Sequence, residues 1–212
     1  MSNLQRLNSV TAIVWLQIVG VALSPGAASA ADDVIENQIL RALTAKKELA
    51  RGVVMGPRAD PAAEASFVET IRGLERVLTA DERDKVADIV KDKPQVDLEI
   101  TFDYDSAEIN SKSLPSVQAL GRALKSPELR GSTIVVAGHT DAAGLETYNQ
   151  HLSQRRADSI KRYLIEKFGI PSSELVPVGF GKTKLKDPNR PFAETNRRVQ
   201  VSNISQGSGA SK

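Results

Sequence analysis

The sequence contains no cysteine and few aromatic residues, 4% of the chain, so several kinds of stabilisation and chemistry are excluded. Without cysteine there can be no disulfide framework, no thiolate metal site and no acylated N-terminal cysteine. The one tryptophan, Trp15, lies in the first thirty residues. The folded part of the chain must therefore be stabilised by an aliphatic core.

A hydrophobic run long enough to span a membrane is also lacking. The apolar stretch over residues 10–23 contains Gln17, whereas a spanning helix needs roughly 20 apolar residues. Arg6 precedes this stretch, and Ala28-Ser29-Ala30 follows it. This order predicts a cleaved secretory signal peptide over residues 1–30, with the mature chain beginning near Ala31. A retained N-terminal membrane anchor is the alternative.

A strong charge of one sign is the third absence. The chain has 28 basic and 26 acidic residues, and loss of Arg6 would leave 28 − 1 = 27 basic residues, a net charge near +1. A general nucleic-acid binder needs a basic patch to neutralise phosphates. We therefore expect no nucleic-acid partner.

Residues 31–94 predict a helical extension. Apolar residues recur at helical spacing over 31–46 and again over 67–78, and glycines and prolines over 52–61 mark a linker between them. Thr79 and Glu82 have capping-box spacing, which predicts a third helix that stops at Pro94. The role of this extension stays open: it packs on the following domain, dimerises, or holds an envelope protein partner.

The hydrophobic period changes to two at residue 95, where alternation predicts a strand through Phe102. Gly169 is placed to end a long helix, and Pro177 assigns the third strand to a sheet edge. The pattern predicts an α/β fold, a βαβαββ sandwich over residues 95–204 with two right-handed crossovers, parallel pairing and one closing antiparallel strand. A disordered tail over 205–212 is expected to follow. The predicted strands cover 95–102, 133–137, 175–180 and 198–204, and the helices cover 114–124 and a segment around 152–164.

Several motifs follow one another in a fixed order within this region. They are Gly138-His139-Thr140-Asp141, Tyr148-Asn149, Leu152-Ser153, Arg155-Arg156-Ala157 and Asn196-Arg197-Arg198-Val199. In this order and spacing they resemble the OmpA-like peptidoglycan-binding domain family, which includes OmpA tails, the lipoprotein Pal and the stator protein MotB. The segment 191–195 departs from the family's usual Gly-Arg approach to the last motif.

The resemblance implies a ligand, the diaminopimelate residue of the peptidoglycan stem peptide. By analogy, Asp141 binds the ligand's ammonium and Arg156 binds its carboxylate, a task that suits the planar guanidinium. Fifteen residues would separate the two by roughly 22 Å along one continuous helix. Asp141 must therefore lie in the loop after the second strand, with Arg156 on an early turn of a helix capped by Ser153.

Further ligand contacts are expected from Thr140, Asn149 and Asp105. Either Arg197 or Arg198 would add positive charge, and we favour Arg197. His139 is expected to fix the loop at a strand end, because no cysteine and only one other histidine could complete a metal site. We predict neither a metal nor a cofactor.

The function expected from these residues is noncovalent wall binding without catalysis, by a periplasmic, outer-membrane-associated protein. The sequence offers no nucleophile elbow, and Gly181-Lys182-Thr183 lacks the earlier glycine of a phosphate loop. The alternative is a stator-type or transporter-type envelope component, anchored at its N-terminus, that uses the same wall-binding domain.

Overall fold

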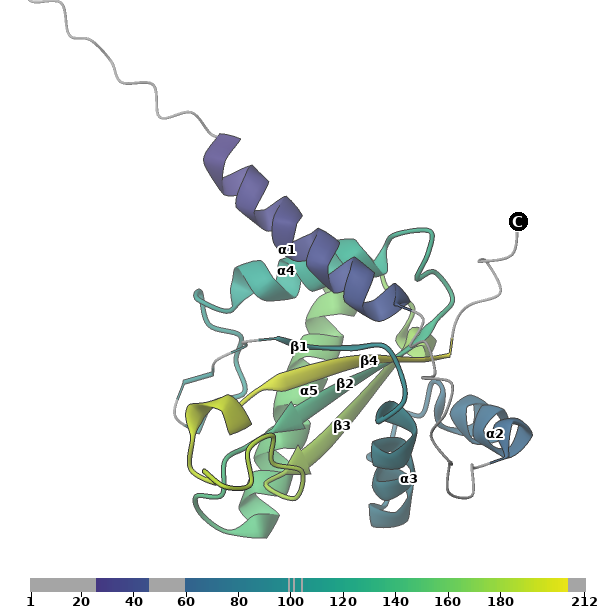
Figure 1. The fold of residues 1–212 in the computed structure, drawn as a ribbon, viewed down its shortest axis with the longest axis vertical. Coiled ribbons are helices and arrows are strands. Elements are labelled where there is room, and N and C mark those ends of the chain that lie inside the picture. The colour runs from purple at the N-terminus through teal and green to yellow at the C-terminus, as the bar shows by residue number, and fades with distance from the viewer. Residues whose placement is uncertain (1–25, 46–59, 99, 101, 104, 206–212) are drawn as a thin grey trace, which may run out of the picture.

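The computed structural model describes residues 26–45, 60–98, 100, 102–103 and 105–205 (Figure 1). Three helices precede the sheet, and helices and strands then alternate. The helices are α1 (Gly26–Thr44), α2 (Pro61–Ile71), α3 (Ala80–Val90), α4 (Leu114–Leu124) and α5 (Glu146–Phe168), with 3-10 turns η1 (Ser172–Glu174) and η2 (Glu194–Asn196). The strands are β1 (Gln95–Leu98), β2 (Thr133–His139), β3 (Leu175–Gly181) and β4 (Val199–Ser205).

The four strands form one mixed sheet in the order β1-β4-β2-β3. β2 and β3 pair in parallel, while β4 runs antiparallel to both of its neighbours, β1 and β2. The predicted α/β sandwich is confirmed, including the edge position of β3 and the antiparallel last strand. The first two strands do not pair directly, however, because β4 lies between them.

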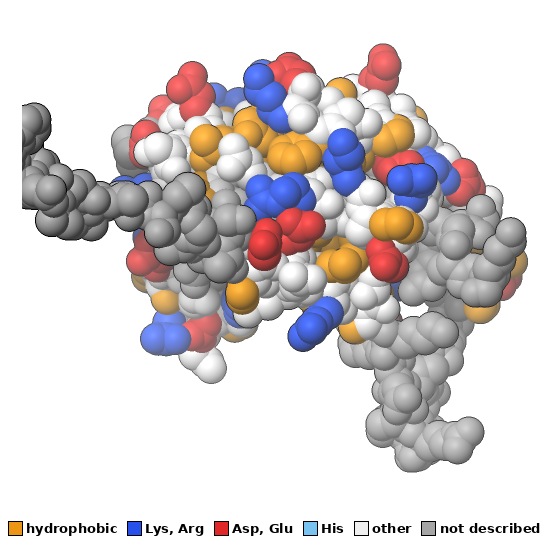
Figure 2. Space-filling model, turned by 90° about the horizontal axis from the view of Figure 1, so that it is seen from above, with side chains coloured by type: hydrophobic (Ala, Val, Ile, Leu, Met, Phe, Trp, Pro, Cys, Tyr) orange, Lys and Arg blue, Asp and Glu red, His pale blue; other side chains and the backbone are white. Residues whose placement is uncertain are grey.

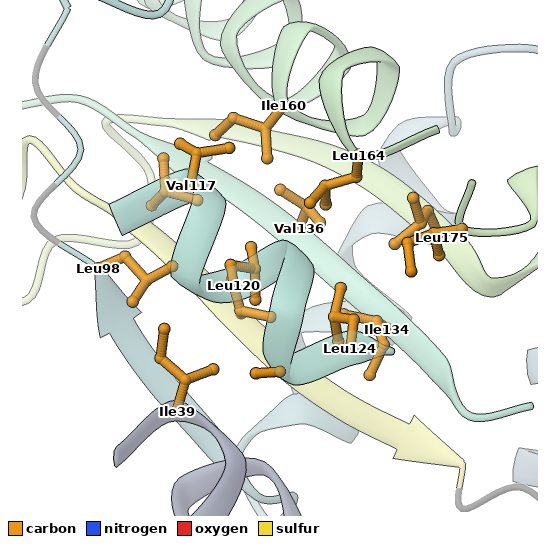
Figure 3. Close-up of a cluster of buried hydrophobic side chains, with 14 of the residues drawn as sticks. Ile39, Leu98, Val117, Leu120, Leu124, Ile134, Val136, Ile160, Leu164 and Leu175 are labelled. Atoms are coloured by element: carbon orange, nitrogen blue, oxygen red, sulfur yellow. The ribbon is translucent and has the colours of Figure 1, made fainter. Parts of the chain in front are cut away.

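One face of the sheet is covered by α4, α5 and the C-terminal part of α1. Leu120 of α4, Ile160 of α5 and Ile39 of α1 are almost completely buried against Ile134 and Val136 of β2 (Figure 3). Apolar residues three and four apart give α4 a continuous stripe toward the strands. This cluster is the larger of the two cores.

The opposite face of the sheet is covered by α2 and α3. Ile71 and Val86 pack there against Val135, Val176 and Val178. Because alternate residues of β2 enter the two cores, all seven of its residues are buried. The molecule therefore has three layers, with helices on both sides of the sheet (Figure 1).

Polar contacts join α1 to the same domain. Glu36 and Arg122 form an ion pair with an O–N distance of 2.7 Å. Asn203 of β4 donates through Nδ2 to the Leu43 carbonyl at 3.1 Å. Of the roles left open for the helical extension, packing on the domain is the one that the structure shows.

Three predicted boundaries are wrong. The second helix ends at Ile71, before Leu74 and Leu78, because Arg72 is extended and Gly73 takes a left-handed φ of 73°. β1 ends at Leu98, so the strand does not reach Phe102. Ser205 belongs to β4 and not to the tail, since its hydroxyl donates to Thr133 at 2.8 Å.

Other local predictions are confirmed. The capping box is formed, with the Glu82 amide donating to the Thr79 hydroxyl and the Thr79 amide donating to the Glu82 carboxylate. Gly169 ends α5 at a φ of 66°, a conformation that glycine adopts at low cost. These outcomes show that local helix signals were reliable where tertiary contacts did not compete with them.

The expected cleavage point falls inside α1, while most of the predicted signal peptide, most of the linker and residues 206–212 lie outside the described residues. No described helix combines the length and apolar composition needed to cross a bilayer. Charges of both signs are interspersed with apolar side chains on the face seen in Figure 2.

Candidate functional site

The loop after β2 carries Asp141 and is held in shape by its own backbone. The Thr140 amide donates to the Gly181 carbonyl at 2.9 Å, and the Ala142 amide donates to the Pro191 carbonyl at 3.0 Å. One carboxylate oxygen of Asp141 accepts from the Ala143 amide at 3.0 Å. The Asp141 side chain is only 14% exposed. Its other oxygen therefore faces a restricted space that few groups can enter.

Thr140 and Asn149 support this loop from within. Both side chains are buried. The Thr140 hydroxyl donates to the Asp141 carbonyl at 3.0 Å, and Asn149 Nδ2 donates to the Ala143 carbonyl at 2.5 Å. Their polar groups are thus engaged in positioning the Asp141 loop.

Arg156 lies near the middle of α5, and its guanidinium is fixed by the segment after β1. Its Nε donates to the Ser106 carbonyl at 3.0 Å and its Nη2 lies 3.5 Å from the Asp103 carbonyl oxygen. The guanidinium carbon lies 4.8 Å from the centre of the Phe102 ring. Burial lowers the pKa of Arg156, yet a guanidinium remains charged at neutral pH. The result is a partly desolvated cation in one orientation.

Two predictions for this helix are wrong: Ser153 does not cap it, and Arg156 does not lie on an early turn. Ser153 lies inside α5, whose N-cap is Leu145, and its Oγ accepts from the Gly181 amide at 2.8 Å. Gln154 similarly accepts from the Gly179 amide at 2.8 Å, and Gln150 donates to the Gly179 carbonyl at 2.6 Å. Side chains of α5 thus satisfy backbone groups of the edge strand β3, which places the helix against the sheet.

Arg197 pairs with Asp141 and lines the same pocket as Arg156. Its Nη1 lies 2.7 Å from Asp141 Oδ2, and its charge, like that of Arg156, faces a common pocket. Arg198, the alternative, is instead 10% exposed and pairs with Asp97 at 3.3 Å. The structure therefore places Arg156 and Arg197 at one pocket and pairs Arg197 with Asp141. Arg198 also lines this pocket, but it is more buried and pairs with Asp97.

A small pocket of about 130 Å³ lies between these arginines. Arg156, Arg197 and Arg198 contribute three positive groups to its wall and Glu194 one negative group. This electrostatic balance suits a carboxylate ligand, with the Asp141 carboxylate next to the pocket for a cation. The remaining lining residues are Ile100, Phe102, Gly138, His139 and Val199.

Asp105 lies at the outer side of α5. It takes a left-handed φ of 51°, accepts from the Tyr148 hydroxyl at 2.5 Å and lies 3.5 Å from Arg155. These contacts connect the segment after β1 to the first turns of α5. Asp105 does not line the pocket described above.

His139 ends β2 and holds the loop after β3. Its Nδ1 lies 3.1 Å from the Lys184 carbonyl oxygen, so this nitrogen carries the proton and donates. Burial, together with the nearby positive charge of Arg198, lowers the pKa of His139 to about 3. The imidazole is therefore neutral at physiological pH. Within the described residues, no cluster of three or more histidines or carboxylates could hold a metal ion.

The residue that sequence analysis left without a role is Asn196. It is completely buried, its Nδ2 donates to the Arg190 carbonyl at 2.9 Å, and its Oδ1 accepts from the Asp187 amide at 2.9 Å. Asn196 thereby shapes the loop that presents Arg197. Its position directly before Arg197 and Arg198 in the last motif is the sequence feature that could have indicated this role.

Comparison with known proteins gives matches over the same region. Residues 101–198 match the OmpA family model. Outer membrane porin F of Pseudomonas fluorescens is 36% identical over 119 residues, which cover 55% of this chain and 34% of the porin. The peptidoglycan-associated lipoprotein of Legionella pneumophila is 35% identical over 101 residues, 47% of this chain and 56% of the lipoprotein. The chain thus aligns with only part of each curated relative.

Among solved structures, the peptidoglycan-associated lipoprotein of Burkholderia pseudomallei matches with a TM-score of 0.42 and 26% identity, over 50% of this chain and 88% of that one. The sequence matches and the motifs around Asp141, Arg156 and Arg197 cover one continuous region. Residues 101–198 of this chain form an OmpA-like domain.

Proposed function

We propose that this chain binds peptidoglycan noncovalently through the diaminopimelate residue of the stem peptide. The support comes from the OmpA-like domain and from relatives whose names describe peptidoglycan association. In this proposal the protein is exported, resides in the periplasm in association with the outer membrane, and connects the envelope to the wall without catalysis.

The observation that carries the proposal is the fixed guanidinium of Arg156 at a pocket next to Asp141. The free end of diaminopimelate has an ammonium and a carboxylate on one carbon. Asp141 binds the ammonium and Arg156 the carboxylate. Because Arg156 is already oriented by two carbonyl groups and the Phe102 ring, its binding costs little further conformational entropy.

Thr140, Asn149 and Asp105 contribute indirectly in this proposal. Thr140 and Asn149 hold the Asp141 loop, while Asp105 holds the segment that fixes Arg156. A single site with two charge-assisted contacts binds modestly. The wall repeats its stem peptides, so many copies of the protein in one membrane would gain from multivalent attachment.

The test is co-sedimentation of the purified protein with cell walls. The wild type should sediment with walls that contain diaminopimelate and stay in solution with walls that contain lysine instead. Asp141→Asn and Arg156→Gln should each weaken binding by about 10- to 100-fold, the range expected for loss of a charge-assisted contact. Sedimentation of either variant at the wild-type level would overturn the proposal.

The matched control is Arg162→Gln. Arg162 is an exposed arginine on the same helix, α5, so its substitution removes an equal charge from the same element. It should leave wall binding unchanged. Thermal unfolding of all variants checks that each one is folded.

A further inference from the structure

Both oxygens of the Asp141 carboxylate already accept a hydrogen bond from the protein. Oδ1 accepts from the Ala143 amide at 3.0 Å, and Oδ2 lies 2.7 Å from Arg197 Nη1. The side chain is 14% exposed, so little room is left for a second cation. A ligand ammonium at Oδ2 therefore competes with the guanidinium for a confined oxygen.

Arg197 can leave Asp141 and still contact another carboxylate. Its Nη2 lies 3.5 Å from Glu194 Oε1, and the Glu194 side chain is 78% exposed. The Arg197 amide donates to the Glu194 carbonyl at 2.8 Å, so the backbone holds the two residues together. The guanidinium therefore lies between one confined and one solvated carboxylate.

Arg156 differs from Arg197 in this respect. Its guanidinium contacts two backbone carbonyls and an aromatic ring, and among the described residues it forms no ion pair with a carboxylate. The Arg197 guanidinium pairs with two carboxylates, and its side chain is 45% exposed. Of the two cations, Arg156 has the properties of a fixed receptor and Arg197 those of a movable one.

We propose that Arg197 is an internal competitor for the site: it occupies Asp141 in the free protein and moves to Glu194 when a ligand ammonium takes its place. This inference rests on the proposed function of Asp141. The apparent dissociation constant then rises in inverse proportion to the fraction of molecules in which Asp141 is free. A ligand ammonium must therefore bind Asp141 more favourably than Arg197 does before it can replace the guanidinium.

The proposal predicts an increase in affinity when the positive charge is removed. Arg197→Gln and Arg197→Met should each bind free meso-diaminopimelate about two- to five-fold more tightly than the wild type, the gain expected when a partly exposed ion pair no longer has to be broken. The measurement is a chemical-shift titration of the full chain. Structural damage would weaken binding, so it cannot imitate this result.

Arg190→Gln is the matched control. Arg190 belongs to the same loop and pairs with Asp187 at 2.7 Å, so its loss changes the net charge equally without freeing Asp141. It should leave the affinity unchanged. Unchanged or weaker binding by both Arg197 variants would overturn the competition, because Arg197 would then be neutral or a ligand contact.

The same titration separates this idea from the proposed function. Asp141→Asn should weaken binding by about 10- to 100-fold in either case. If Asp141→Asn binds as tightly as the wild type, the proposed function itself fails. If Asp141→Asn weakens binding as expected but the Arg197 variants do not gain affinity, only the competition is wrong.

Discussion

The buried imidazole of His139 shows how one residue makes the stability of this domain depend on pH. It is 3% exposed, its ring centre lies 5.4 Å from that of Phe180, and the charges of Arg198 and Asp97 act on it. Burial favours the neutral ring, so the pKa of His139 falls to about 3, from 6.5 in an exposed histidine. Folding therefore competes with protonation.

The sign of the pH effect follows from these two values. The unfolded chain binds a proton at His139 below about pH 6.5, whereas the folded chain does so only near pH 3. The stabilisation is complete above pH 6.5 and is lost as the pH falls toward 3. Between pH 7.5 and pH 5 the unfolding free energy should fall by about 2 kcal/mol.

Urea unfolding at pH 7.5 and pH 5 measures this change. The variant His139→Gln should be less stable at pH 7.5 but lose less stability on acidification. His151→Gln is the control, because His151, the other histidine, is exposed. An equal acid loss in the wild type and the His139 variant would contradict the assignment.

At the scale of elements, the close approach of α5 to β3 decides the geometry of the site. Gln150, Ser153 and Gln154 bond to the backbone of β3, so the helix supplies contacts that a further strand would otherwise make. An added Cβ at Gly179 would lie 2.5 Å from the backbone nitrogen of Gln154. Only glycine allows this approach.

Gly179→Ala should therefore force α5 away from the sheet. We expect a loss of about 2–3 kcal/mol or more in unfolding free energy, as for overpacked cores. Gly169→Ala is the comparison, since no atom lies within 4 Å of its added Cβ and only its φ of 66° is strained. That variant should lose about 1–2 kcal/mol. If denaturant unfolding shows equal losses of unfolding free energy for the two variants, the close approach of α5 to β3 does not exclude a side chain at Gly179.

At the scale of the whole molecule, the helical extension completes the fold. α2 and α3 cover the face of the sheet that carries Val135, Val176 and Val178. Without them these side chains would be exposed to water, at a cost of about 25 cal/mol per Å² of apolar surface. A separate role for α2 and α3 as a flexible extension does not fit this burial.

Ile71→Ala tests whether the second layer belongs to one cooperative unit. Ile71 is 1% exposed, so truncation should lower the unfolding free energy by about 2–5 kcal/mol. Val77→Ala is the control, because Val77 follows the same helix and is 55% exposed; it should change stability by less than about 0.5 kcal/mol. A single shifted transition is expected, and two separate transitions would contradict a single unit.

The sequence by itself determined what depends on near neighbours along the chain. The capping box at Thr79, the helix end at Gly169 and the edge position of β3 each follow from local stereochemistry or from the missing amide of Pro177. The placement of Asp141 in the loop after a strand also followed, since strand and loop patterns are local.

Only the tertiary structure decided which distant groups meet. Nothing in the local pattern inserts β4 between β1 and β2 or turns Ser153 toward β3. The contact of Arg197 with Asp141 joins residues 56 apart in sequence and depends on how the loop around Asn196 folds. Pairing over such separations is set by packing free energy summed over the whole core, which no single segment of sequence contains.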